Sequence, residues 1–215
     1  MNGPASTVLI VFAKAPVAGQ VKTRLMSALG PVGAADLAAQ LLERAVAAGM
    51  SAGFDAVELC AAPDASHPAF ARLAARHAGL LLSVQGDGDL GARMHRALTR
   101  RLDGCDRVLL IGTDAPALDA AVLRAAAQAL AGHDAVFVPA HDGGYALVGL
   151  VRPQPALFTD MPWSTPRVMV ETRERARHAG LRWAELPAVA DIDEPADLIH
   201  LPAQWLQALR FEERP

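Results

Sequence analysis

Residues 8–12 form an unbroken apolar segment, VLIVF, near the start of the 215-residue chain. Val8, Ile10 and Val11 are β-branched, and this composition is typical of a strand that is buried on both faces of a parallel sheet. Such a sheet needs a covering layer on each side. The segment therefore predicts the central strand of an α/β fold.

Strand-like and helix-like segments alternate along the rest of the chain. Further strands are predicted over residues 56–61, 80–84, 108–111, 134–139, 145–150 and 181–186. Helices are predicted over residues 32–48, 68–77, 90–102, 120–130 and 163–180. This order predicts a three-layer α/β sandwich, with a mostly parallel sheet, right-handed crossovers and one antiparallel hairpin at residues 142–144. Because 215 residues suffice for one well-buried core, we expect a single domain over residues 1–215.

Three cations follow the first strand: Lys14, Lys22 and Arg24, with Gly19 among them and no acidic residue in the stretch. Ligands of open α/β sheets bind at the carboxyl ends of the strands, and Arg and Lys suit phosphate oxygens. The spelling matches neither a Walker loop nor a dinucleotide fingerprint. The loop favours a nucleotide-type anion, with Lys22 and Arg24 facing solvent until phosphate binds. The alternative is a solvated basic loop that only closes off the strand.

Acidic residues follow other predicted strands. Asp114 comes just after the strand at residues 108–111, where a carboxylate could hold Mg²⁺ beside phosphates or could merely shape a turn. Asp191 and Asp193 lie on the same side of an extended segment, with Ile192 pointing into the core. This pair could share a divalent ion, or Asp193 could only cap the last helix.

Two glycine-rich turns offer backbone to ligands. In residues 85–93, QGDGDLGAR, Asp89 is a predicted helix N-cap, and Gly88 and Gly91 would let the backbone approach a flat ligand. A capped glycine turn would explain the same residues. Gly143 and Gly144 would let a substrate lie against backbone amides, although hairpin chemistry also accounts for them.

The remaining candidates concern an acceptor. Asp142 would face the substrate from the turn that contains the two glycines. Ser164 and Thr165 supply a hydroxyl N-cap for the helix that they are predicted to open. If this helix start faces the cleft, its free N–H groups would favour an anionic acceptor.

Composition excludes several classes of protein. The net charge of −3 and the pI of about 6.1 give no indication of a nucleic-acid-binding surface. The first residues, MNGPAST, lack a basic segment followed by an apolar core and a cleavage site, so we expect no signal peptide. No apolar run approaches the roughly 18 residues that span a bilayer. We therefore expect a soluble, cytoplasmic protein without a membrane span. Cys60 and Cys105 lack metal or redox spacing, and no chemistry is assigned to them.

The segment FAKAPVAGQVKTRL (residues 12–25) resembles the opening motif of a bacterial family of glycosyltransferase-A-like proteins related to nucleotide-diphospho-sugar transferases. Many members have Pro and Lys where this chain has Ala18 and Gln20. The segments QGDGDLGARM, LLIGTDAP, DGGYALVGL, WSTPRVMVET and DIDEPADL follow in the order of that family, so the resemblance covers residues 7–200. More distantly, the chain is similar to guanylyltransferases of molybdenum-cofactor and deazaflavin-precursor synthesis.

The resemblance implies a glycosyltransferase-A-like fold and assigns roles to several residues. Gly88 and Gly91 would lie near the base and ribose, with Arg93 reaching toward the phosphates. Asp114 resembles the metal-binding Asp of sugar-nucleotide transferases. The pair Asp191/Asp193 corresponds to an acidic pair that helps hold Mg²⁺ in the deazaflavin-precursor guanylyltransferases.

These patterns predict a transferase that depends on Mg²⁺ or Mn²⁺ and uses a nucleotide or nucleotide-sugar donor with a small-molecule acceptor. Lys14, Gly19, Lys22 and Arg24 would bind the donor, and Lys22 and Arg24 would also act in catalysis. Glycosyl transfer, with Asp142 as the base, is favoured because the whole motif order follows the glycosyltransferase-A-like family. The alternatives are nucleotidyl transfer, which releases pyrophosphate and needs no protein base, and a non-catalytic nucleotide-binding protein.

Overall fold

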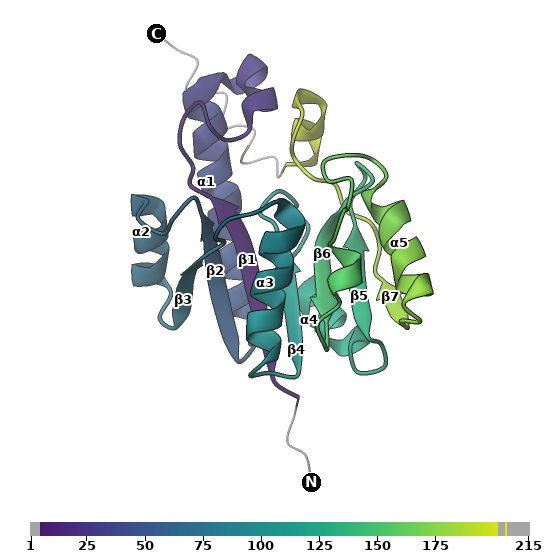
Figure 1. The fold of residues 1–215 in the computed structure, drawn as a ribbon. Coiled ribbons are helices and arrows are strands. Elements are labelled where there is room, and N and C mark those ends of the chain that lie inside the picture. The colour runs from purple at the N-terminus through teal and green to yellow at the C-terminus, as the bar shows by residue number, and fades with distance from the viewer. Residues whose placement is uncertain (1–4, 202–204, 206–215) are drawn as a thin grey trace.

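The computed structural model describes residues 5–201 and residue 205 (Figure 1). Seven strands form one sheet in the order β3-β2-β1-β4-β6-β5-β7. The strands are β1 (Thr7–Lys14), β2 (Ala56–Ala62), β3 (Leu80–Val84), β4 (Arg107–Ile111), β5 (Ala135–Pro139), β6 (Tyr145–Leu150) and β7 (Trp183–Glu185). Neighbouring strands are parallel except that β6 runs antiparallel to β4 and β5. The predicted mostly parallel sheet with a β5–β6 hairpin is confirmed.

Strand β1 is buried along nearly its whole length, as its apolar sequence predicts. It pairs in parallel with β2 on one side and β4 on the other. Its side chains alternate between two core clusters, with Leu9 and Val11 in one and Ile10 and Phe12 in the other. This alternation follows from the twofold period of a strand, and both faces of β1 are therefore covered.

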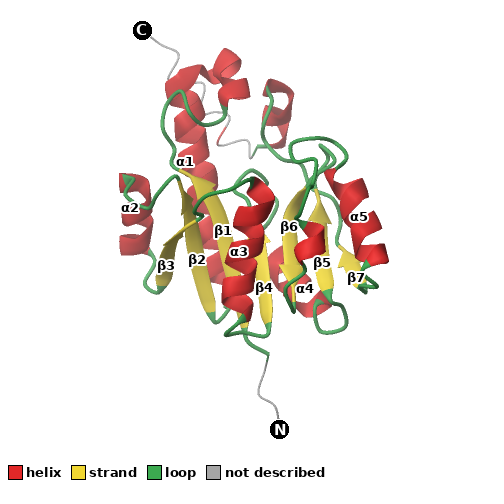
Figure 2. Ribbon diagram, viewed as in Figure 1, coloured by secondary structure: helices red, strands yellow, loops and turns green. Residues whose placement is uncertain are grey.

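Helices cover both faces of the sheet and complete three layers (Figure 2). The helices α1 (Met26–Ala52), α2 (Pro68–Arg76) and α4 (Ala120–Ala129) contribute to the cluster that contains Leu9. The helices α3 (Leu90–Leu102) and α5 (Val168–His178) contribute to the cluster that contains Ile10. Short 3₁₀ helices lie at η1 (Thr23–Leu25), η2 (Pro155–Leu157) and η3 (Pro195–His200).

The start of α1 contains a kink at the Gly30-Pro31 pair. Gly30 has φ 67° and ψ 170°, a conformation that interrupts the helix before Pro31. Glycine tolerates positive φ, and proline is favoured at the first position of a helix. The predicted helix start at residue 32 therefore matches the second part of α1, while the first turn from Met26 is additional.

By length and composition, the helix over Thr23–Ala52 could also cross a membrane. A core helix of a globular fold passes the same test. Leu37 and Leu41 are buried in one hydrophobic cluster and Leu42 and Val46 in another. Packing within the fold thus accounts for these four apolar residues of α1.

The predicted cap of α5 is wrong. The helix begins at Val168, no side chain caps it, and Arg167 precedes it. Ser164 has a left-handed backbone with φ 61°, and Thr165 Oγ1 donates to the backbone oxygen of Pro162 at 2.7 Å. Residues 163–166 therefore form a turn before the helix, because the hydroxyl group bonds locally and does not reach the first N–H groups of the helix. The last strand, β7, is also shorter than predicted.

Candidate functional site

Three segments that are distant in sequence meet where the parallel strands end: the loop after β1, the loop after β4, and residues 191–193. Lys22 joins them. Its Nζ donates to the backbone oxygen of Ile192 at 2.6 Å and to Asp193 Oδ1 at 2.8 Å, and it pairs with Asp114 Oδ1. The backbone N–H of Ile192 donates to the backbone oxygen of Asp114 at 2.9 Å. The structure thus brings one predicted cation and two predicted metal ligands into contact.

Backbone geometry directs Lys22 inward. Its φ of 48° and ψ of 42° are left-handed, which costs a residue with a side chain about 1 kcal/mol. Only 6% of its side chain is exposed. Burial alone would lower the pKa of Lys22, but the charges of Asp114 and Asp193 and the hydrogen bonds to them outweigh it and raise the pKa above its ordinary value. The ammonium stays charged, and the expectation that Lys22 faces solvent is wrong.

The other two cations of the loop lie on the surface. The side chain of Arg24 is 70% exposed, and its Nη1 donates to Glu194 Oε1 at 3.2 Å. Lys14 is exposed at the end of β1. Gly19 has φ 82°, and an added Cβ would meet open space, so the backbone conformation alone favours glycine there. Arg24 and Lys14 are therefore accessible to an anionic ligand, whereas Lys22 is engaged.

Acidic side chains are in excess around Lys22. The turn that carries Asp142 lies near residue 191, because a parallel bridge joins Ala140 to Val189. Burial is the main cause that raises the pKa of Asp191 to about 6, and the negative charge of Asp142 is the second. Asp142 itself accepts the backbone N–H of Gly144 through Oδ1 at 2.7 Å, as expected for a hairpin turn. The site gathers more negative than positive charge.

The donor chemistry of the site fits a hard divalent cation. Within the described residues, no three acidic, His or Cys groups converge as a metal cluster. Asp114 and Asp193 nevertheless converge on one cation, the Lys22 ammonium, and their side chains are 45% and 44% exposed. Mg²⁺ and Mn²⁺ favour carboxylate and carbonyl oxygens, and both kinds of donor contact the ammonium. Asp191, the third predicted ligand, lies two residues before Asp193 in the same segment but does not converge with the other two carboxylates on one point.

The structure shows which residues cap the last helix, one of the two roles that the sequence allowed for Asp193. The 3₁₀ helix η3 follows Glu194. Asp197 Oδ2 accepts the backbone N–H groups of Asp193 and Glu194 at 3.0 and 2.7 Å. Glu194 and Asp197 therefore form a capping box at this helix start, and the carboxylate of Asp193 instead contacts Lys22. Metal binding by Asp193 stays a prediction.

Two residues that the sequence interpretation missed, Gln85 and Arg96, order the glycine-rich segment after β3. Buried Gln85 donates through Nε2 to the backbone oxygen of Cys60 at 3.1 Å and accepts Arg93 Nη1 at 3.0 Å. Arg96 donates to the backbone oxygens of Gln85 and Asp87 at 2.7 and 2.6 Å. Arg96 follows Arg93 by three residues on a predicted helix, so the sequence did indicate that both arginines lie on the same helix face.

The two glycines predicted to face a ligand differ. A Cβ on Gly91 would lie 2.3 Å from the backbone oxygen of Phe158 and 2.8 Å from Trp163 Nε1. Gly91 therefore lets the protein pack against itself, which is sufficient to explain glycine at this position. Its contact with a nucleotide stays a prediction. Gly88, with φ 100°, shapes the turn before α3, where only glycine adopts the conformation readily.

The predicted acceptor residues come together. A Cβ on Gly143, whose φ is 91°, would lie 2.3 Å from the backbone oxygen of Pro166, and the backbone oxygen of Gly143 accepts the N–H of Met169 at 2.8 Å. The β5–β6 turn thus packs directly on the turn before α5. This contact joins the two turns that carry the residues predicted to act on an acceptor: Asp142, Gly143, Gly144, Ser164 and Thr165.

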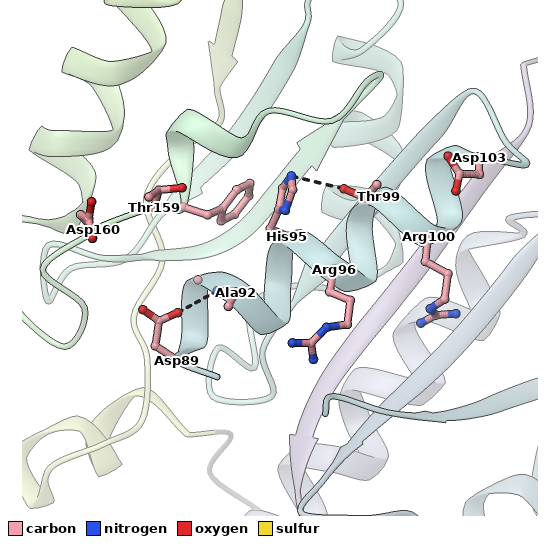
Figure 3. A pocket seen from close by; sticks show the side chains of 11 residues that line it. Asp89, Ala92, His95, Arg96, Thr99, Arg100, Asp103, Thr159 and Asp160 are labelled. Atoms are coloured by element: carbon pink, nitrogen blue, oxygen red, sulfur yellow. Dashed lines mark hydrogen bonds between the residues drawn. The ribbon is translucent and has the colours of Figure 1, made fainter. Parts of the chain in front are cut away.

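A groove of about 670 Å³ runs along α3, from Asp89 to Asp103, with Phe158 on its other wall (Figure 3). The rings of His95 and Phe158 lie 5.8 Å apart in it. Of the predicted site residues, only Gly91 lines this groove. The candidate site is therefore the cluster of cations and carboxylates at the ends of β1 and β4.

Solved structures share this fold. A candidate nucleotide-diphospho-sugar transferase from Desulfovibrio desulfuricans G20 is 30% identical, with a TM-score of 0.83 over 97% of this chain and 95% of that one. A nucleotidyl transferase from Methanothermobacter thermautotrophicus is 17% identical, with a TM-score of 0.62 over 96% and 100%. Rv0371c from Mycobacterium tuberculosis H37Rv, in complex with manganese, is 19% identical, with a TM-score of 0.54 over 92% and 98%.

The fold is that of the nucleotide-utilising transferases. The comparison with curated proteins gives no match. The chain belongs to the bacterial family described as "Uncharacterized protein conserved in bacteria (DUF2064)", which matches residues 35–165. The predicted fold class and family resemblance are confirmed.

Proposed function

We propose that this protein is a metal-dependent cytoplasmic glycosyltransferase that moves a sugar from a nucleoside-diphosphate sugar to a small-molecule acceptor. The observation that carries the proposal is the convergence of Asp114 and Asp193 on a single cation, beside the exposed Lys14 and Arg24. A divalent ion and a diphosphate are the ligands that suit such an arrangement. The similarity to the candidate nucleotide-diphospho-sugar transferase, over nearly the whole of both chains, supports the choice of donor.

Each charged group has a role in this reaction. Arg24 would bind donor phosphate through its planar fork and Lys14 as a point charge. Asp114, Asp191 and Asp193 would hold Mg²⁺ or Mn²⁺, which when bound offsets the charge that develops on the departing diphosphate. These residues act by position and charge, as is usual when a phosphorylated group leaves.

Acceptor activation falls to Asp142. Among the described residues its hydrogen bond to Gly144 uses only Oδ1, so Oδ2 is free to take the proton of an acceptor hydroxyl. The backbone of Gly143 and Gly144 and the turn that contains Ser164 would position that acceptor. Gln85 would act indirectly by holding Arg93 toward the donor.

Nucleotidyl transfer is the second candidate, and the hydrogen bonding of Asp142 favours it. One oxygen of this carboxylate, Oδ1, already accepts the backbone N–H of Gly144 in its own turn. Nucleotidyl transfer needs no protein base. The exposed Lys14 and Arg24 would then bind a nucleoside triphosphate, with pyrophosphate as the leaving group. A non-catalytic nucleotide-binding protein would have no use for the converging carboxylates.

A panel of nucleotides with and without Mn²⁺ tests the proposal. The melting temperature should rise most with nucleoside diphosphates or their sugar conjugates plus metal, since a hundredfold excess over Kd adds about 2.7 kcal/mol of stability. Preference for a triphosphate, followed by pyrophosphate release with a phosphorylated acceptor, would overturn glycosyl transfer in favour of the second candidate. Equal stabilisation with and without metal would indicate a binding protein.

A further inference from the structure

We propose that Lys22 is a resident cation that exchanges with the metal ion: binding of Mg²⁺ or Mn²⁺ at Asp114 and Asp193 releases the Lys22 ammonium toward the donor phosphates. This inference rests on the proposed function, from which it takes the metal and the phosphates. It assigns Lys22 two positions, one in the ligand-free protein and one in the loaded site.

The contacts of Lys22 make the exchange necessary. Its ammonium lies 2.8 Å from Asp193 Oδ1, 2.6 Å from the backbone oxygen of Ile192 and in contact with Asp114 Oδ1. A metal bound by the same carboxylates would lie about 2.0–2.6 Å from their oxygens. The two cations would then repel each other at close range. They cannot both remain between Asp114 and Asp193.

The local structure permits the movement. The backbone of Lys22 is held in the left-handed region, a conformation that persists only while surrounding contacts maintain it. Its partners Asp114 and Asp193 are about half exposed, so the ammonium is bound by carboxylates that solvent and ions can reach. Lys22 belongs to the same loop as Lys14 and Arg24. A flexible lysine stem released from the carboxylates would reach an anion bound by that loop.

Exchange predicts that metal and phosphate bind cooperatively. Without phosphate, the metal must displace Lys22 from two carboxylates, and the ammonium gains no new partner. With phosphate present, the released ammonium has an anion to bind. By linkage, the metal must strengthen phosphate binding by the same factor by which phosphate strengthens metal binding.

The composition of the chain allows a direct test, because Lys14 and Lys22 are its only lysines. Acetylation followed by mass spectrometry reports both, with exposed Lys14 as the internal reference. We expect Lys22 to react several-fold more slowly than Lys14 in the metal-free protein. Mn²⁺ alone should raise its rate, and Mn²⁺ with pyrophosphate should lower it again. If Mn²⁺ binds and the rate of Lys22 does not change, the exchange is overturned.

Mn²⁺ titration provides the second test. Without any phosphate, Lys22→Met should bind Mn²⁺ about tenfold more tightly than the parent, the ratio that corresponds to 1.4 kcal/mol. Lys14→Met removes the same charge from the same loop without touching the carboxylates, and it should stay close to the parent. Equal affinity of the parent and Lys22→Met would overturn the exchange and leave metal-dependent transfer standing. Absence of Mn²⁺ binding in all three proteins, with and without pyrophosphate, would overturn both.

Discussion

Two ionic clusters in this molecule have opposite arrangements of charge. In the Lys22 cluster (Lys22, Asp114 and Asp193), a buried cation meets two carboxylates that are each about 45% exposed. In the Glu58 cluster (Glu58, Arg100 and Arg101), a carboxylate with no exposed surface on β2 meets two guanidinium groups of α3 that are 43% and 26% exposed. Both clusters hold a central ion out of solvent, but only the first lies on loops at the ends of strands.

The difference lies in what surrounds the central ion. Burial alone would raise the pKa of Glu58, but hydrogen bonds from Arg100, Ser83 and Arg101 outweigh it and hold the pKa below its usual value. These contacts tie α3 to two adjacent strands. The contacts of Lys22 tie together three loops. Glu58 thus connects regular elements of the fold, whereas the carboxylates that contact Lys22 lie on loops and are about half exposed to ligands.

The largest expected effect is on stability at Glu58. Glu58→Gln should lower the free energy of unfolding by about 3 kcal/mol, because an amide at this fully buried position cannot accept the hydrogen bonds from Ser83, Arg100 and Arg101 as the carboxylate does. Urea denaturation measures the loss. Glu185→Gln is the matched control: it removes the partner of Arg173 from a more exposed pair and should cost about 0.5 kcal/mol. Equal losses in the two variants would contradict a special role for Glu58.

The same cluster predicts a pH dependence. The pKa of Glu58 is lower in the folded protein than the value of about 4.3 in the unfolded chain. The stabilisation is therefore fully present above the unfolded pKa and is lost as the pH falls through the folded pKa. The gap between the urea midpoints of the parent and Glu58→Gln should narrow as the pH is lowered below 4. A gap that stays constant would show that packing, and not charge, causes the loss.

Removal of the other central ion should have a smaller effect on stability. Lys22→Met should cost about 1 kcal/mol of unfolding free energy, because Asp114 and Asp193 are exposed enough to be hydrated when their partner is removed. Urea denaturation under the same conditions as for Glu58→Gln measures this loss, so that the two free energies can be compared directly. A loss as large as that of Glu58→Gln would mean that the Lys22 cluster is a structural element of the fold.

The smallest predicted effect has the opposite sign. Because the pKa of Asp191 is raised to about 6, the folded protein holds a proton there that the unfolded chain releases near pH 4. Charged Asp191 therefore destabilises the fold above pH 6, and Asp191→Asn should stabilise it there by about 0.5 kcal/mol. Thermal unfolding at pH 8 and pH 4 should show a gain at the first pH only. A gain of equal size at pH 4 would contradict the titration of Asp191.

The architecture could be predicted because it depends on local patterns. The apolar run of β1 and the capping carboxylate of Asp89, which accepts the N–H of Ala92 at 2.8 Å, both have short-range signatures. The candidate carboxylates could likewise be identified, since each follows a strand. What failed was the direction of individual side chains.

The direction of Lys22 depends on contacts with residues about 170 positions away, and no local pattern encodes them. Its left-handed backbone is also unusual for a residue other than glycine, asparagine or aspartate. The sequence also does not show that Phe158 and Trp163 pack against Gly91. Gln85 was missed for a related reason: its amide links the ends of neighbouring strands, which only the folded sheet brings together.

The anchoring of Ile192 has a consequence for behaviour on heating. This residue is buried in a small hydrophobic cluster with Leu25 of η1 and Leu37 and Leu41 of α1, separate from the two main clusters. Its sequence neighbours on both sides are Asp191 and Asp193, the carboxylates that we propose bind the metal. Small clusters open locally at lower free energy than a main core. Warming should therefore loosen the cation loop and the acidic segment together, so that ligand affinity falls at temperatures where the sheet is still intact.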